Sequence, residues 1–317
     1  MKIVIPGGTG QVGGILQRAL AARGHEVVVL SRHAGALEPG VRHTPWDGRS
    51  LGAWASEIDG ADAVINLAGR TVSCRYTEEN LRQMMDSRVE STRVVGEAIA
   101  KAAAPPRVWL QMSTATIYAD RRDAPNDEST GIIGGHEPGV PGYWEYSVRI
   151  AQTWEATQLT ADVPETRKVQ LRAAMVMSPD RGGVFDVLLR MVRLGLGGPV
   201  AGGRQYVSWI HDEDFVRAVE LLLVREELSG PVNLAAPEPL PQRDLMRVLR
   251  RAWGQPVGLP ATKWMAEIGA FALRSDTELL LKSRRVVPGR LLDEGLEFAY
   301  GQWGAAAEDL VRRVRSR

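Results

Sequence analysis

Short apolar runs alternate with amphipathic stretches along the first half of the chain. The runs at residues 2–5 and 26–30 are rich in β-branched side chains, and residues 15–24 between them have helical spacing that ends at a glycine. Uninterrupted apolar runs are typical of parallel strands that are covered on both faces. Further runs at 62–69 and 107–120 continue the pattern, so the sequence predicts an α/β fold with a doubly wound parallel sheet.

The turn between the first strand and the first helix is rich in glycine. Its sequence is PGGTGQVGG, in which Gly7, Gly10 and Gly13 form G-x-x-G-x-x-G, a spacing variant of the dinucleotide-binding fingerprint. One such glycine makes a tight turn, one lets backbone approach a pyrophosphate, and one packs helix against strand. The helix N-terminus adds free N–H groups and a partial positive charge. We therefore expect a cofactor pyrophosphate here, held by Gly7, Thr9, Gly10, Gln11 and Val12.

The residues that follow the predicted strands indicate which dinucleotide binds. Proteins selective for NAD carry an acid at the end of the second strand, whereas this chain carries Ser31 and Arg32, which suit the 2′-phosphate of NADP(H). An arginine that is simply exposed at a strand end is the alternative. Asp47 ends the third strand, where it is placed to meet an adenine amino group. After the fourth strand, a small-residue turn would let backbone pass close to the cofactor at Leu67, Ala68 and Gly69.

Composition and charge exclude several classes of protein. With 317 residues, 44% of them hydrophobic and 24% charged, the chain is long enough for a nucleotide-binding domain and a second, smaller lobe. Its net charge of +1 lacks the electrostatic footprint of proteins that bind nucleic acids or membrane surfaces. The single cysteine, Cys74, rules out an internal disulfide framework and a cysteine-based zinc site. Because we find neither a membrane-length apolar run nor a signal peptide, we expect a cytoplasmic protein.

Several motifs resemble known proteins. The stretches GGTGQVGG, LSR and NLAG together resemble the extended type of the short-chain dehydrogenase/reductase superfamily. Residues 87–99, 195–223, 230–240 and 285–292 are similar to an atypical extended family known as NAD-dependent epimerase/dehydratase, with a C-terminal domain of unknown function. The likeness extends from residue 3 to about residue 300. It implies a Rossmann-type sheet joined to a smaller mixed α/β lobe that binds substrate.

We expect the two lobes to interleave along the chain. Residues 1–171, with 206–235 returning to them, form the predicted Rossmann NADP(H)-binding domain, and residues 172–205 and 236–317 form the predicted substrate lobe. A segment rich in Gly, Pro and Asp at residues 118–142 lies beside the expected site and is a candidate lid.

The resemblance implies catalytic residues that this chain keeps only in part. In the superfamily a Tyr moves a proton at the substrate oxygen, a Lys four residues later lowers the pKa of that Tyr, and a Ser or Thr orients the substrate. The run STATIYAD matches the hydroxyl segment and places Thr114 at that position, with Ser113 beside it. Counting back from Glu155 places Ser147 at the Tyr position and Ala151 at the Lys position. No Tyr-x-x-x-Lys occurs anywhere in the sequence.

Two residues are candidate replacements for the missing pair. Tyr143 projects roughly 80° from the direction of Ala151 around an ideal helix, so it is a candidate acid; simple packing at the helix start is the alternative. Arg88 aligns with an Asn near the superfamily's active site, where it either supplies the missing positive charge or is a plain surface arginine. Three acids follow His211, but no second His or spaced carboxylate pair completes a metal site, so we expect no metal.

Two functions are compatible with these residues. The first is an NADP(H)-dependent oxidoreductase or epimerase that acts on a small carbonyl or hydroxyl compound, with Thr114 orienting the substrate and Tyr143 or a bound water supplying the proton. The second is a non-catalytic NADP(H)-binding protein that senses redox state or regulates a partner. The retained hydroxyl segment favours the enzyme, and the missing Tyr and Lys favour the sensor. We expect a small-molecule substrate and neither nucleic acid nor membrane as partner, and the superfamily resemblance implies a homodimer.

Overall fold

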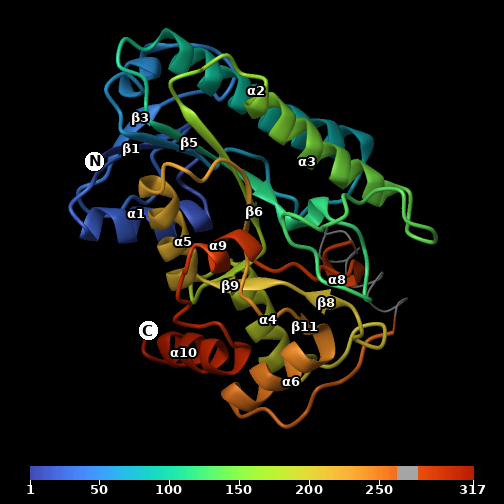
Figure 1. Ribbon diagram of the computed structural model, residues 1–317. Helices are drawn as coiled ribbons and strands as arrows, with labels where there is room; N and C mark the ends of the chain where they lie inside the picture. Colours follow the sequence, from blue (N-terminus) through green and yellow to red (C-terminus); the bar gives the residue numbers. More distant parts are fainter. Residues whose placement is uncertain (263–277) are drawn as a thin grey trace.

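The computed structural model describes residues 1–262 and 278–317, and its centre is a seven-stranded parallel sheet (Figure 1). The strands are β1 (Lys2–Pro6), β2 (Glu26–Ser31), β3 (Arg42–Pro45), β4 (Ala63–Asn66), β5 (Val108–Thr114), β6 (Arg167–Ala173) and β10 (Gly230–Leu234). Their order is β10-β6-β5-β4-β1-β2-β3, so the direction of winding reverses between β1 and β4. This confirms the predicted doubly wound sheet of Rossmann type.

Helices cover both faces of the sheet, because successive side chains of each strand point to opposite sides. One face carries α1 (Gln11–Ala22) and α5 (Asp212–Val224), and the other carries α2 (Glu78–Lys101) and α3 (Tyr143–Leu159) (Figure 1). Ile3 of β1 packs in the cluster that holds Leu16 of α1 and Phe215 of α5. Its neighbour Val4 packs on the opposite side, in the cluster that holds Val94 of α2.

A smaller lobe lies beside the sheet (Figure 1). It consists of α4 (Val184–Arg193), α6 (Gln242–Trp253) and α10 (Trp303–Arg315), with two small sheets that pair β7 (Met175–Met177) with β9 (Trp209–His211) and β8 (Tyr206–Val207) with β11 (Leu240–Pro241). Its core packs Phe185 and Leu245 with Trp209 and Trp303, whose rings meet edge to face at 4.9 Å. The lobe therefore has the predicted mixed α/β composition. Within the described ranges, no helix is long and apolar enough to cross a membrane.

The C-terminal part of the chain does not stay in the smaller lobe. Residues 278–298, which the sequence assigns to the substrate lobe, include α8 (Glu278–Leu281) and α9 (Gly289–Asp293). Leu291 joins the core on the α1 side of the sheet, and Val286 packs with Ile117 of the short helix η2 (Ala115–Ile117), directly after β5. A second short helix, η1 (Ala53–Glu57), lies beside the edge strand β3, where Glu57 pairs with Arg42. The C-terminal segment thus returns to the carboxyl edge of the Rossmann sheet.

A chain of buried hydrogen bonds ties α3 to the sheet. Glu155 on α3 accepts two hydrogen bonds from Arg172 on β6, at 2.9 and 2.8 Å, and the two residues are only 7% and 9% exposed. Arg172 also donates to the Tyr118 hydroxyl at 2.9 Å, which in turn donates to Asn233 at 2.9 Å. Because the guanidinium fork and the carboxylate satisfy each other, both charges tolerate burial.

Replacing Arg172 with Met should destabilise the fold strongly, because it leaves the Glu155 carboxylate buried without its partner. We expect a loss of about 3–5 kcal/mol in the free energy of unfolding, measured by urea denaturation. Arg107→Met is the matched control, since Arg107 pairs with Asp62 at 3.2 Å on the surface, where an ion pair contributes at most about 1 kcal/mol. Equally small losses in both variants would contradict the role given to the buried pair.

Candidate functional site

The glycine turn joins β1 to α1 at the carboxyl edge of the sheet. Gly7 has a φ of +74°, and a Cβ there would lie 2.6 Å from Ala68 Cα, so only glycine fits. A Cβ on Gly13 would lie 1.9 Å from the carbonyl oxygen of Gly8, which reflects how closely α1 packs against the turn. Gly10, by contrast, is exposed and has nothing within 4 Å of an added Cβ. Two glycines therefore serve close packing, while the third leaves open space.

That open space lies at the N-terminus of α1. Gly10 is the N-cap residue, no side chain caps the helix, and its first turn holds no acidic residue. Its free N–H groups and its dipole suit an anion such as a pyrophosphate. Thr9 is exposed beside Gly10, and Gln11 and Val12 are half-buried. The Gln11 amide also donates to the Ser178 hydroxyl, directly after β7, at 3.4 Å, so the turn lies where the two lobes meet.

The three side chains expected near the adenosine end differ in availability. Arg32 is exposed and makes no ion pair with any residue that the structure describes. Ser31 is buried, and its hydroxyl donates to the carbonyl of His33 at 2.6 Å. The Asp47 carboxylate accepts hydrogen bonds from the hydroxyl and the amide of Ser50, which lower the pKa of Asp47 to about 2. Arg32 is thus the one of the three whose polar group is not already engaged.

Arg88 is buried beside the turn that follows β4. Within that turn Leu67 and Ala68 are half-buried, and the exposed Gly69 lies so close that its Cβ would be 3.2 Å from Arg88 Cζ. Arg88 is 9% exposed and donates from Nη1 to the carbonyl of Met84 at 3.0 Å. Burial lowers the pKa of Arg88 to about 10, and no ion pair of this residue is found in the described part of the chain. Arg88 is therefore not a plain surface arginine.

The two positions that the sequence matches to the superfamily's Tyr and Lys lie on one face of α3. Ser147, Ala151 and Trp154 are four and three residues apart, so they follow one another along that face. Ala151 is fully buried, and the Arg88 guanidinium carbon lies 4.9 Å from the ring centre of Trp154. The charge of Arg88 therefore lies next to the helical turn where the superfamily carries its Lys.

The expected hydroxyl groups on β5 point in different directions. Ser113 is buried and donates to Glu155 at 2.6 Å, as part of the network beneath α3. Thr114 follows on the opposite face of the strand, is half-buried, and accepts from the amide of Thr116 at 3.1 Å. The structure thus separates Ser113 from Thr114. Tyr143 begins α3, but the placement of its side chain lies outside what the structure describes.

Sequence reasoning missed three charged residues near η2. Glu278, Lys282 and Arg284 are 1%, 2% and 6% exposed. Lys282 Nζ donates to the carbonyl of Thr116 at 2.9 Å, and Arg284 Nε donates to the Thr116 hydroxyl at 3.0 Å. One signal could have found them: Lys282 is one of only five lysines in the chain, and it ends the apolar run ELLLK. Nothing in the sequence pattern, however, places that run against β5.

His211 caps α5 and contacts α10 of the smaller lobe. It accepts from the amide of Glu213 at 3.2 Å at the start of α5, and its other ring nitrogen lies 3.2 Å from Asp309 of α10. The residue is fully buried, and burial lowers the pKa of His211. Among the residues described, no group of three or more His, Cys, Asp or Glu side chains could hold a metal ion.

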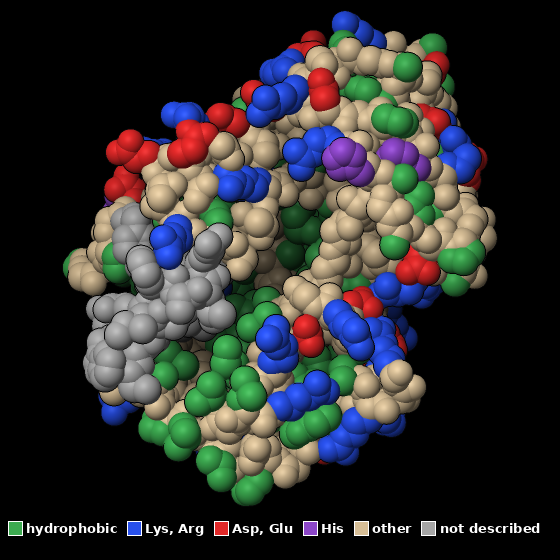
Figure 2. All heavy atoms as spheres, turned by 180° about the vertical axis from the view of Figure 1, so that it is seen from behind, with side chains coloured by type: hydrophobic (Ala, Val, Ile, Leu, Met, Phe, Trp, Pro, Cys, Tyr) green, Lys and Arg blue, Asp and Glu red, His purple; other side chains and the backbone are tan. Residues whose placement is uncertain are grey.

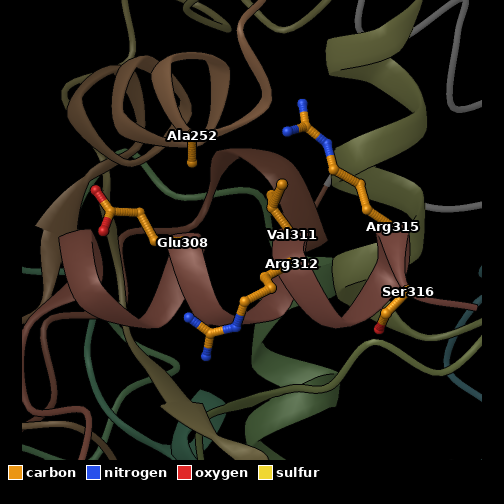
Figure 3. A pocket seen from close by; sticks show the side chains of 6 residues that line it. All are labelled: Ala252, Glu308, Val311, Arg312, Arg315 and Ser316. Atoms are coloured by element: carbon orange, nitrogen blue, oxygen red, sulfur yellow. The ribbon is translucent and has the colours of Figure 1, made fainter.

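The described part of the surface has more than one hollow. Seen from behind, a deep hollow between the two lobes has hydrophobic side chains in its depth (Figure 2). A shallower pocket lies between α6 and α10 (Figure 3) and is lined by Ala252, Glu308, Val311, Arg312, Arg315 and Ser316. None of these lining residues belongs to the glycine turn or to the environment of Arg88, so this second pocket is separate from the candidate site.

The parallel sheet, its switch point between β1 and β4 and the glycine turn define a dinucleotide-binding protein of Rossmann type. Residues 3–235 match the model of the NAD dependent epimerase/dehydratase family, and residues 262–310 match a domain of unknown function, DUF1731. The chain belongs to the NAD-dependent epimerase/dehydratase family, which confirms the resemblance seen in its motifs.

Individual relatives cover the chain from end to end. The human epimerase family protein SDR39U1 is 31% identical over 315 residues, which are 98% of this chain and 100% of the relative. The epimerase family protein YfhF of Bacillus subtilis is 26% identical over 312 residues, or 98% of each chain. A crystal structure of human SDR39U1 with NADPH is 29% identical, has a TM-score of 0.84, and covers 98% of this chain and 99% of that one.

A methyl group added at each of two adjacent glycines of α1 should change the free energy of unfolding in opposite directions. Gly13→Ala pushes a Cβ into the carbonyl of Gly8, so we expect a loss of about 1–3 kcal/mol in the free energy of unfolding. Gly14→Ala is the matched control, because its Cβ would lie 3.7 Å from the flexible end of Arg18, and Ala favours a helix over Gly by about 0.5–1 kcal/mol. Chemical denaturation measures both, and equal effects would contradict the close contact.

Proposed function

We propose that this chain is an NADP(H)-dependent oxidoreductase or epimerase that acts on a small carbonyl or hydroxyl compound. The observation that carries the proposal is the glycine turn, in which Gly10 is open beside an uncapped helix N-terminus while Gly7 and Gly13 are fixed by close contacts. These residues fit a dinucleotide, because free N–H groups and the helix dipole face the space where a pyrophosphate would lie. The human relative that was crystallised with NADPH supports the same class of cofactor.

Arg32 supports the phosphorylated form of the cofactor. Its guanidinium is exposed at the end of β2 and is not paired with a carboxylate in the described ranges, so it is available to a 2′-phosphate. Ser31 and Asp47 contribute less in this proposal, since each side chain already makes hydrogen bonds to its neighbours. Selectivity for NADP(H) therefore rests mainly on one arginine.

Thr114 and Arg88 are the groups that we propose for the substrate end. Bound NADP(H) would donate or accept one hydrogen with its electron pair at the substrate carbon. Thr114, at the carboxyl end of β5, would orient the substrate oxygen with its hydroxyl. Arg88 would supply the positive charge that a Lys at position 151 would carry. Its buried guanidinium lies against Trp154, which is on the same face of α3 as Ala151. A buried cation stabilises developing negative charge strongly because water does not screen it.

A non-catalytic redox sensor is the second candidate. One observation favours it: Ala151 is a fully buried apolar residue at the position where the superfamily has its Lys. A sensor must bind NADPH and NADP⁺ with different affinities, because only a difference in affinity shifts a conformational equilibrium. Equal affinities together with turnover of a carbonyl compound would exclude the sensor.

Calorimetric titration of NADPH, NADP⁺ and NADH tests the cofactor. We expect tighter binding of the phosphorylated cofactors, and we expect Arg32→Ala to weaken NADPH binding at least about tenfold while leaving NADH unchanged. Arg107→Ala is the matched control, because Arg107 is an exposed arginine at the opposite, amino edge of the sheet. Weak or equal binding of all three cofactors would remove the basis of the proposed function.

Arg88→Met separates a functional charge from a structural one. Met fills much of the same space without a buried charge, so the free energy of unfolding should stay constant or rise by up to about 4 kcal/mol. Turnover should nevertheless fall about a hundredfold, because the transition state loses its cation. The control is Arg93→Met, since Arg93 lies exposed on the same helix. A strong loss of stability in Arg88→Met, measured by denaturation, would assign Arg88 to the fold instead.

A further inference from the structure

The C-terminal segment places a Glu-x-x-x-Lys pair against the positions where the superfamily's Tyr and Lys are missing. Glu278 begins α8, and the amide of Lys282 donates to the Glu278 carbonyl at 3.1 Å, so the two residues are one helical turn apart. Ser147, at the Tyr position, donates from Oγ to Glu278 Oε2 at 2.5 Å. Lys282 Nζ lies 3.6 Å from Glu278 Oε1. A carboxylate and an ammonium thus stand at the face of α3 that carries Ser147 and Ala151.

Hydrogen bonds connect this pair to the expected hydroxyl group on β5. Lys282 Nζ donates to the carbonyl of Thr116 at 2.9 Å, and the amide of Thr116 donates to Thr114 Oγ1 at 3.1 Å. On the other side of the pair, Glu278 accepts a hydrogen bond from Ser147 Oγ. The positions that correspond to the superfamily's Thr and Tyr are therefore linked through residues of the C-terminal segment.

Burial of the Lys282 ammonium is costly for a purely structural role. Taking a carboxylate and an ammonium out of water costs several kcal/mol per ion, and only excellent geometry offsets that cost. Arg172 and Glu155 achieve it with a two-pronged contact, whereas the Lys282 ammonium lies 3.6 Å from its carboxylate and donates to a backbone carbonyl. The segment is already anchored by apolar contacts of Val286. Buried charges of this kind are typical of functional sites.

The chemistry of the side chains favours the Glu278 carboxylate, and not the Ser147 hydroxyl, as the group that exchanges a proton. A serine hydroxyl needs an adjacent base before it takes part in proton transfer, whereas a glutamate exchanges protons by itself. Ser147 is also much smaller than a tyrosine, so it leaves space on this face of α3 that the Glu278 carboxylate reaches from α8.

We propose that Glu278 is the acid–base residue of this protein, and that Ser147 and Lys282 position it. The inference rests on the proposed function. In the oxidation of an alcohol, the substrate O–H bond breaks and its proton goes to the Glu278 carboxylate, while the adjacent C–H hydrogen leaves with its electron pair to NADP⁺ and a C=O bond forms. In the reduction of a carbonyl compound, the proton returns from Glu278 to the substrate oxygen.

Charges of both signs surround the pair. Burial lowers the pKa of Lys282, and the attraction of Glu278 opposes that shift. Arg284 adds a second positive charge near Glu278, while Asp120 and Glu137 face Lys282. Removing the charge of Lys282 should therefore let Glu278 take up a proton at higher pH.

Variants of the full-length protein test the assignment. The assay follows the reduction of phenanthrenequinone, diacetyl and nitrobenzaldehyde by NADPH, and the reverse oxidation of each product, across a range of pH. Glu278→Gln keeps the shape of the side chain but cannot exchange a proton, so turnover should fall about a hundredfold or more. The NADPH dissociation constant, measured without substrate and well below the unfolding temperature, should stay at the wild-type value, whereas the unfolding temperature should fall because Lys282 loses its buried carboxylate partner. Added formate should restore part of the turnover of Glu278→Ala.

The pH profile separates acid–base chemistry from anchoring. In the wild-type protein, kcat/KM for oxidation should fall as the pH drops, because the carboxylate becomes protonated; Glu278→Gln should lack this decline. Lys282→Met should move the decline to higher pH by about one unit or more. Glu145→Gln is the matched control, because Glu145 is exposed on the same helix as Ser147.

Four results would overturn the inference while leaving the proposed function in place. They are full turnover in Glu278→Gln, an unchanged pH profile in Lys282→Met, a loss of NADPH affinity as large as the loss of turnover, and a loss of turnover confined to Tyr143→Phe. A wild-type protein that binds NADPH but converts none of the three probes would instead overturn the oxidoreductase proposal, and the inference would fall with it.

Discussion

Charged groups beneath α3 are removed from water, and each must find a partner there. Glu155 and Arg172 meet this constraint with a two-pronged ion pair that joins α3 to β6 and extends to Tyr118. The position of α3 over the carboxyl edge of the sheet depends on this contact, and with it the positions of Ser147 and Ala151. Arg88 meets the constraint only in part, since its guanidinium has one hydrogen bond and an aromatic ring but no ion pair in the described ranges. This partly satisfied charge lies beside the turn at Gly69, where a ligand would be expected.

The site combines two sources of charged groups. The Rossmann lobe contributes the glycine turn, Thr114 and Arg88, all of them at the carboxyl ends of parallel strands or on the helix beside them. The C-terminal segment contributes Glu278 and Lys282, which reach the same edge because residues 278–298 return from the smaller lobe. Residues 3–235 and 262–310 match separate family models. The return of the C-terminal segment to the sheet gives a physical reason why the two regions pack together. In the proposed function, this segment supplies the charged groups that the face of α3 lacks.

The sequence predicts the sheet and the cofactor turn well because both depend on local patterns. The four apolar runs at residues 2–5, 26–30, 62–69 and 107–120 indicate parallel strands, and β1, β2, β4 and β5 form there. The spacing of Gly7, Gly10 and Gly13 predicts three different tasks: the positive φ of Gly7 fits the tight turn, the close contact of Gly13 fits the packing of helix on strand, and Gly10 leaves open space. Side-chain partners are less predictable. Ser113 and Thr114 are neighbours in the sequence, yet strand geometry sends them to opposite faces, and only Thr114 stays near the candidate site.

By itself the sequence determines the family, the apolar runs that become parallel strands, the glycine turn and the absence of a Tyr-x-x-x-Lys pair, because each depends on short motifs along the chain. Tertiary structure alone decides that Arg88 is buried instead of lying on the surface, since burial depends on Trp154, more than sixty residues away along the chain. It also decides that Glu278 meets Ser147 across 131 positions of sequence separation. No local pattern specifies such a contact, because it is set by the packing of the C-terminal segment on η2 and not by the residues of the segment alone.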